Sequence, residues 1–79
     1  MAHILTIYDR KNGHTIQINN KLSGIRVHVD GNEVASSKGL FSTSASGELN
    51  GYRVDVTLHT GFEMPHITII ANNELLFTS

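Results

Sequence analysis

The sequence predicts an all-β protein, a compact antiparallel β-sandwich or small barrel of seven to eight short strands. Three observations predict this fold. Apolar and polar residues alternate along most of the chain, as they do on strands with one buried face. Turn-forming pairs such as Asn12-Gly13 and Asn50-Gly51 separate the alternating runs. No stretch has the apolar spacing of an amphipathic helix, and strands without crossover helices pair antiparallel.

The first half of the chain divides into two predicted hairpins. Residues 4–8 and 14–18 form the first hairpin. Residues 25–30 are the clearest strand, because three aliphatic residues alternate there with polar ones. A two-residue turn within residues 30–32 leads into a strand that includes Val34, on the same face as the earlier valines.

The second half is less regular at its start. Residues 36–47 are rich in Ser, Thr, Gly and Ala, and both a short strand and a loop fit them. Residues 52–59 show the strongest alternation in the chain, and residues 60–65 are a predicted loop. Residues 66–71 and 75–77 form the last predicted hairpin.

Two registers compete in this last hairpin. A two-residue turn at Asn72-Asn73 pairs Ala71 with Glu74 and suits the turn chemistry of asparagine. A three-residue loop pairs Ala71 with Leu75 and collects four large apolar side chains on one face. We predict the three-residue loop, because burying those side chains should outweigh about 1 kcal/mol of local strain.

All these strands belong to one expected domain, residues 1–79, since a chain of 79 residues has room for a single core. That core is predicted to consist of the inward-facing side chains of the alternating strands. They are Leu5, Ile7, Ile16, Ile18, Ile25, Val27, Val29, Val34, Tyr52, Val54, Val56, Leu58, Ile67 and Ile69.

The composition indicates which cellular compartment and which classes of partner to expect. The chain has no cysteine, which fits a reducing compartment. It shows no signal peptide, no apolar run that spans a bilayer and no N-glycosylation site, so we expect a cytoplasmic protein without a membrane partner. The chain has six Lys and Arg against seven Asp and Glu, and the basic residues do not cluster in the sequence, so a nucleic-acid partner is not expected.

Metal and catalytic motifs are weak in this sequence. His28 with Asp30, and Asp55 with His59, have the spacing of residues on one strand face, yet pairing with neighbouring arginines explains them more simply. No Gly-x-Ser-x-Gly elbow, phosphate-binding loop or telling pair of carboxylates occurs. We therefore expect no metal, no cofactor and no enzymatic activity.

Four apolar residues outside the strand period are the candidate partner contacts. Phe62 and Met64 lie in the predicted loop beside Pro65. They either close an open end of the core or form an exposed tip, and exposed aromatic and Met side chains are enriched at interfaces. Leu40 and Phe41 pose the same alternative, with the core favoured.

Several segments together resemble one repeat of the Fas apoptotic inhibitory molecule family. They are the strand-turn-strand of residues 27–34, the Phe41 segment, the alternating strand of residues 52–58, the Gly61-Phe62 pair and the closing hairpin of residues 67–75. The likeness covers roughly residues 25 to 77. The resemblance implies a compact antiparallel β-sandwich and non-enzymatic, protein-binding behaviour. It transfers no site residue.

The function we expect is that of a small non-enzymatic β-sandwich that acts by binding another protein. One alternative is a small inhibitor from a phage or mobile element that occludes a larger enzyme complex. Another is a ligand- or carbohydrate-binding module, which the small number of aromatic residues disfavours. A homo-oligomer also remains open at this point.

Overall fold

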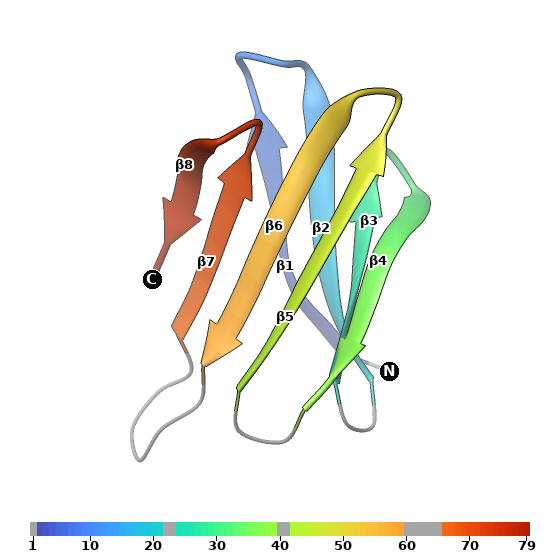
Figure 1. The fold of residues 1–79 in the computed structure, drawn as a ribbon, viewed down its shortest axis with the longest axis vertical. Coiled ribbons are helices and arrows are strands. Elements are labelled where there is room, and N and C mark those ends of the chain that lie inside the picture. The colour runs from blue at the N-terminus through green and yellow to red at the C-terminus, as the bar shows by residue number, and fades with distance from the viewer. Residues whose placement is uncertain (1, 22–23, 40–41, 60–65) are drawn as a thin grey trace.

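The computed structural model of the chain describes residues 2–21, 24–39, 42–59 and 66–79. It confirms the predicted fold class: the described residues form eight antiparallel strands in two four-stranded sheets (Figure 1). The first sheet holds β1 (Ala2–Asp9), β2 (His14–Lys21), β3 (Gly24–Val29) and β4 (Asn32–Lys38). The second holds β5 (Ser42–Leu49), β6 (Tyr52–His59), β7 (His66–Ala71) and β8 (Glu74–Thr78).

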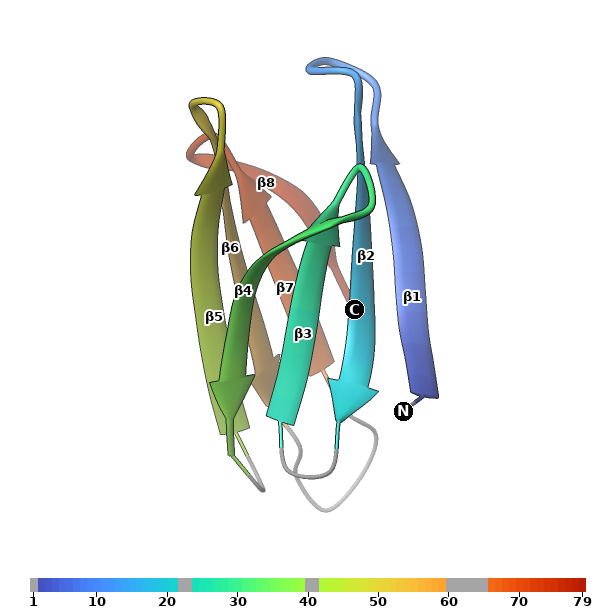
Figure 2. The same cartoon turned by 90° about the vertical axis from the view of Figure 1, so that its right-hand side faces the viewer.

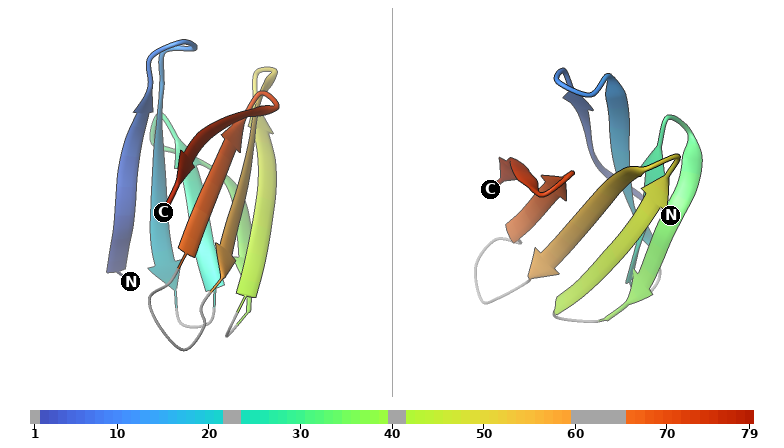
Figure 3. Two further views of the ribbon diagram at one scale, coloured as in Figure 1. Left: turned by 90° about the vertical axis from the view of Figure 1, so that its left-hand side faces the viewer. Right: turned by 45° about the horizontal axis from the view of Figure 1, so that its top comes forward.

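Each sheet is a simple meander, in which every strand pairs with the next strand along the chain. The sheets face each other as a sandwich. On one side β4 and β5, which follow each other in the chain, run side by side (Figure 2). On the opposite side the two remaining edge strands, β1 and β8, border the sandwich (Figure 3, left).

Turn chemistry closes three of the hairpins. Each has a two-residue turn with positive φ at both positions, which Asn, Asp and Gly tolerate best. These turns are Asp30-Gly31 (φ 51° and 86°), Asn50-Gly51 (50° and 86°) and Asn72-Asn73 (49° and 66°). The first hairpin has a longer turn, in which the backbone N–H of Gly13 donates to the carbonyl oxygen of Asp9 at 2.8 Å.

The core lies between the two sheets and follows the predicted alternation. Its buried apolar residues are Ile16, Ile18, Ile25, Val27, Val29, Ala45, Tyr52, Val54, Val56, Ile67, Ile69 and Ala71. Four further predicted core residues, Leu5, Ile7, Val34 and Leu58, pack against this core but are only half-buried. Every predicted core residue therefore lies in the core or packs against it, while Ala45 and Ala71 are buried core residues that were not predicted.

The predicted three-residue loop in the last hairpin is wrong. The structure has the two-residue turn, with Ala71 opposite Glu74. A bulge then shifts the register, so that Ile70 lies opposite Leu75 while Ile69 lies opposite Phe77. The extra residue in β8 restores the Ile69–Phe77 pair of the longer loop, but Leu75, which that loop would have buried, is exposed on the outer face. The bulge thus combines the two-residue turn with an inward Phe77.

The uncertain segment of residues 36–47 contributes to two strands. β4 continues to Lys38 and β5 begins at Ser42. In β5 the side chains of Thr43 and Ala45 point inward and are buried. Small inward side chains make this strand hard to recognise from alternation, because the apolar signal is weak.

The two sheets are structural repeats of each other, which the sequence did not reveal. The bulge between the last two strands falls after Val27 in the first sheet and after Ile69 in the second. Cross-strand neighbours also coincide: Ile7–Ile16–Val29 and Leu5–Ile18–Val27 in the first sheet correspond to Gly47–Val54–Ala71 and Ala45–Val56–Ile69 in the second. The two sheets therefore share strand order and register, but not the residues at matching positions.

Candidate functional site

The residues predicted as partner contacts, Phe62, Met64, Leu40 and Phe41, lie outside the described residues. The structure therefore places none of them, and their role as core plugs or contacts stays a prediction. The described residues instead point to the side of the sandwich between β1 and β8. We call it the open side and define it by the half-buried inward residues Leu5, Ile7, Leu76 and Phe77.

The contrast with the opposite side explains why this side is open. A Cβ added at Gly47 of β5 would lie 2.2 Å from the carbonyl oxygen of Val34 in β4. The absence of a side chain at Gly47 thus lets the backbones of β4 and β5 approach closely. Ala45, the preceding inward residue, is also small. Small side chains close this side of the sandwich.

The equivalent inward positions of β1 carry large side chains. Ile7 lies opposite Ile16 as Gly47 lies opposite Val54. Leu5 likewise takes the place of a small residue in β5. Such side chains prevent β1 from meeting β8 as closely as β5 meets β4: among the described strands, β4 and β5 pack against each other, whereas β1 and β8 do not. Leu5 and Ile7 are consequently only half-buried.

The edge strand β1 lacks the features that usually block strand addition. It is eight residues long and carries no Asp, Glu, Lys or Arg between Ala2 and Tyr8. Native edge strands are commonly protected by charge, proline, shortness or coverage. In β1 only a bulge between His3 and Leu5 interrupts the pairing with β2. The outer edge from Leu5 onward is regular.

The two large apolar side chains that are exposed in the described chain both belong to the strands of the open side. Tyr8 of β1 is 57% exposed and Leu75 of β8 is 63% exposed. Both point away from the core, on the outer faces of their sheets. A large exposed aromatic next to an unprotected edge is a typical element of a protein contact.

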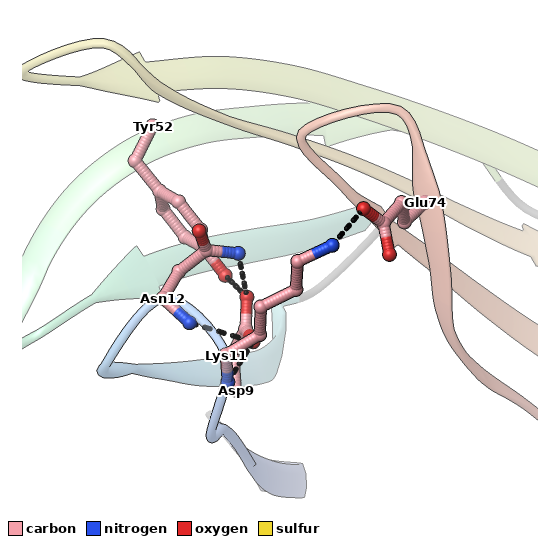
Figure 4. Close-up of polar contacts among 5 residues, drawn as sticks. All are labelled: Asp9, Lys11, Asn12, Tyr52 and Glu74. Atoms are coloured by element: carbon pink, nitrogen blue, oxygen red, sulfur yellow. Dashed lines mark hydrogen bonds and ion pairs between the residues drawn. The ribbon is translucent and has the colours of Figure 1, made fainter.

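A polar cluster closes the turn end of the open side (Figure 4). Asp9 of β1 points inward and is only 3% exposed. Its Oδ2 accepts hydrogen bonds from the Tyr52 hydroxyl at 2.7 Å and from Nδ2 of Asn12 at 2.8 Å. Its Oδ1 accepts from the backbone N–H groups of Lys11 and Asn12 at 3.1 and 3.2 Å. Lys11 also forms an exposed ion pair with Glu74, which joins this turn to β8.

These contacts set the protonation states of the cluster. Burial by itself raises the pKa of the Asp9 carboxyl, but the hydrogen bonds from Asn12, Tyr52 and Lys11 outweigh it and hold this pKa below its usual range. Burial and the adjacent Asp9 carboxylate raise the pKa of the Tyr52 hydroxyl far above its usual value. At neutral pH a carboxylate therefore accepts from a protonated phenol. This bond ties the first sheet to the second.

The imidazole of His14 extends the cluster along the turn end. Its ring lies 4.1 Å from the Tyr52 ring between centroids. Its Nδ1 lies 2.6 Å from Oδ2 of Asp30, whose Oδ1 accepts from the backbone N–H of Thr15 at 2.9 Å. This acceptance and the neighbouring imidazole lower the pKa of the Asp30 carboxyl. The polar side-chain atoms of Asp9, Tyr52, His14 and Asp30 are thus already engaged in bonds between strands, which is a structural use of these residue types.

The residues considered as metal ligands are engaged elsewhere. Asp30 lies in a turn, so it does not share a strand face with His28 as the sequence suggested. His28 contacts Asn19 instead, with 3.3 Å between Nδ1 and Nδ2. Asp55 accepts from Ser46 and pairs with Arg53, as expected for an outer-face carboxylate. Within the described ranges no three His, Cys, Asp or Glu side chains form a group that could hold a metal ion.

Comparison with protein-family models, with curated proteins and with solved structures found no match for this chain. The resemblance to the Fas apoptotic inhibitory molecule family accordingly stays a prediction. In the described segments, no helix is long and apolar enough to cross a membrane. The candidate site therefore rests on the geometry of the open side.

Proposed function

We propose that this chain is a non-enzymatic binding module that holds a protein partner along its open side, with a strand of the partner added to β1. One observation carries the proposal. Leu5 and Ile7 are large, apolar and only half-buried on an edge strand that carries no charge between Ala2 and Tyr8. An added strand would cover both side chains and pair with the outer edge of β1.

An extended protein segment fits such an edge better than other ligand classes. Strand addition derives affinity from main-chain hydrogen bonds, and specificity from alternate side chains that enter the core face. The inward positions of β1 offer apolar contacts to every second residue of such a segment. Tyr8 adds an exposed aromatic ring on the outer face, where a globular partner would contact it. The family resemblance, which implies protein-binding behaviour, supports the same proposal.

Site-specific photo-crosslinking tests this proposal. We would replace Tyr8 with p-benzoylphenylalanine in the full chain and irradiate it in extracts of the cells that naturally produce the protein. The matched control carries the same probe at Thr57, which is exposed on the outer face of the central strand β6. We expect protein adducts from position 8 and not from position 57.

The adducts should also depend on the edge of β1. Thr6→Lys places a charge on this edge strand and should remove the adducts from position 8. Absence of any adduct from position 8, or equal adducts from both positions, would contradict the proposed function. An enzyme as the crosslinked partner, inhibited by the purified chain, would make the module an inhibitor of that enzyme.

A further inference from the structure

We infer that the strand added to β1 is β1 of a second copy of this chain, which gives a twofold-symmetric dimer. This inference rests on the proposed function, because it names the partner of the same edge. A twofold antiparallel pair of β1 strands would join the first sheets of both copies into one eight-stranded sheet.

The four sheet edges are not equally available. β4 and β5 face each other on the closed side of the sandwich, and they carry Glu33, Lys38 and Glu48. β8 is only five residues long, is bulged, and starts with Glu74 in an ion pair. Short, bulged and charged edges resist strand addition. β1 is the edge that remains among the described strands.

Two copies of β1 can pair antiparallel about a twofold axis that passes next to Thr6. In this register, apolar side chains of one copy lie opposite apolar side chains of the other. Leu5 of each copy then lies opposite Ile7 of the other, and both lie on the inner face. A shift of the axis to Ile7 would instead place Leu5 opposite Asp9, whose carboxylate is already bound by Tyr52 and Asn12. The sequence around Thr6 thus selects one register in which apolar side chains meet apolar side chains.

Charge is compatible with a second copy in this register. No charged residue lies between Ala2 and Tyr8, so like charges do not face each other across the pair. The cations of the first turn, Arg10 and Lys11, lie beyond the ends of the paired segment, and Lys11 is already held by Glu74. The pairing covers Leu5 and Ile7 of both copies at once. Four half-buried side chains are thereby removed from water by one contact.

A charge introduced at position 6 tests this arrangement, because position 6 of one copy lies directly opposite position 6 of the other across the axis. Sedimentation velocity of the full chain over a wide concentration range should show a dimer for the unchanged protein. Thr6→Lys and Thr6→Glu should each weaken the dimer about fivefold at low salt, since like charges then lie directly opposite. An equal mixture of the two variants should restore dimers, now mixed. Thr57→Lys, on an exposed site of a central strand, should leave the dimer unchanged.

Three results would overturn the inference: a monomer at every concentration, charged variants that dimerise as well as the unchanged chain, or a mixture that fails to restore the dimer. If a charged variant does not fold, hydrogen exchange of the unchanged chain decides, because β1 amides must become more protected as concentration rises. A monomer whose position 8 crosslinks to a different protein would refute the second copy and keep the proposed function. A monomer without any adduct would refute both.

Discussion

Removal of one hydroxyl group tests how the two sheets are held together at the turn end. Tyr52→Phe keeps the buried ring and its contact with His14 but removes the hydrogen bond to Asp9. A hydrogen bond to a charged group contributes about 1.5–3 kcal/mol to stability. Asp9 retains three other hydrogen bonds, from Asn12 and Lys11. We therefore expect a loss near the lower end, about 1–2 kcal/mol at pH 7.

The effect should depend on pH with a definite sign. The folded-state pKa of Asp9 lies below its usual value, so the carboxylate stabilises the fold above the unfolded pKa of about 3.9. That contribution is lost as the pH falls through the folded pKa. Tyr52→Phe removes one cause of the lowered pKa. The difference in unfolding free energy between variant and unchanged protein should therefore shrink in acid.

Urea titrations followed by circular dichroism, at neutral and at acidic pH, measure this difference. Tyr8→Phe is the matched control, because the Tyr8 side chain is exposed and its change should stay within about 0.5 kcal/mol. Equal stabilities of the two variants at pH 7 would refute the reasoning about the inter-sheet bond. A loss that persists undiminished where Asp9 is protonated would refute the charge-assisted part of it.

Three substitutions check the core, the closed side and the last turn by the same titration. Val54→Ala should cost about 1–3 kcal/mol, because Val54 is 1% exposed and its truncation leaves a cavity; a change within about 0.5 kcal/mol would mean that the faces of β6 are misassigned. Gly47→Val should cost about 1–3 kcal/mol, because its Cβ would meet the carbonyl oxygen of Val34; a neutral effect would show that the closed side is loosely packed. Asn73→Ala should cost about 1–2 kcal/mol, since φ is 66°, while Asn73→Gly should be nearly neutral; equal losses would show that φ at this position does not matter.

Alternation within single strands is a local property, and it was readable from the sequence. The inward positions of β3 and β6 repeat every second residue with apolar side chains, so strand, face and core membership followed together. The turn at Asn50-Gly51 and a turn within residues 30–32 were readable for the same reason, because positive φ depends on the residues at those positions; the structure places the second at Asp30-Gly31. The register of β8 was not readable. A bulge allowed the two-residue turn to coexist with the Ile69–Phe77 pair, whereas the sequence analysis compared only two regular registers.

The role of Asp9 was missed because the first strand was expected to end at Tyr8. In the structure β1 continues to Asp9, and the inward sequence of Leu5 and Ile7 continues with it. Two signals were present in the sequence. Asp9 follows Leu5 and Ile7 at the same two-residue spacing, so its side chain points inward as theirs do. Tyr52 is an inward tyrosine, and its hydroxyl needs a hydrogen-bond acceptor. No local sequence pattern indicates that Asp9 and Tyr52, which are far apart in the chain, lie next to each other in the fold.

The open side follows from how two similar sheets differ at two inward positions. Register alone would let β1 meet β8 as β5 meets β4, since the cross-strand neighbours of the two sheets coincide. Gly47 lets the backbones of β4 and β5 approach closely but buries no apolar side chain. Ile7, at the equivalent position of β1, has a large apolar side chain that the sandwich covers only in part. A domain of 79 residues has a small core, so a half-covered Ile7 and Leu5 represent stabilisation that this chain does not complete alone. A strand added to β1 would complete it, which is why the open side and not the polar turn end is the candidate site.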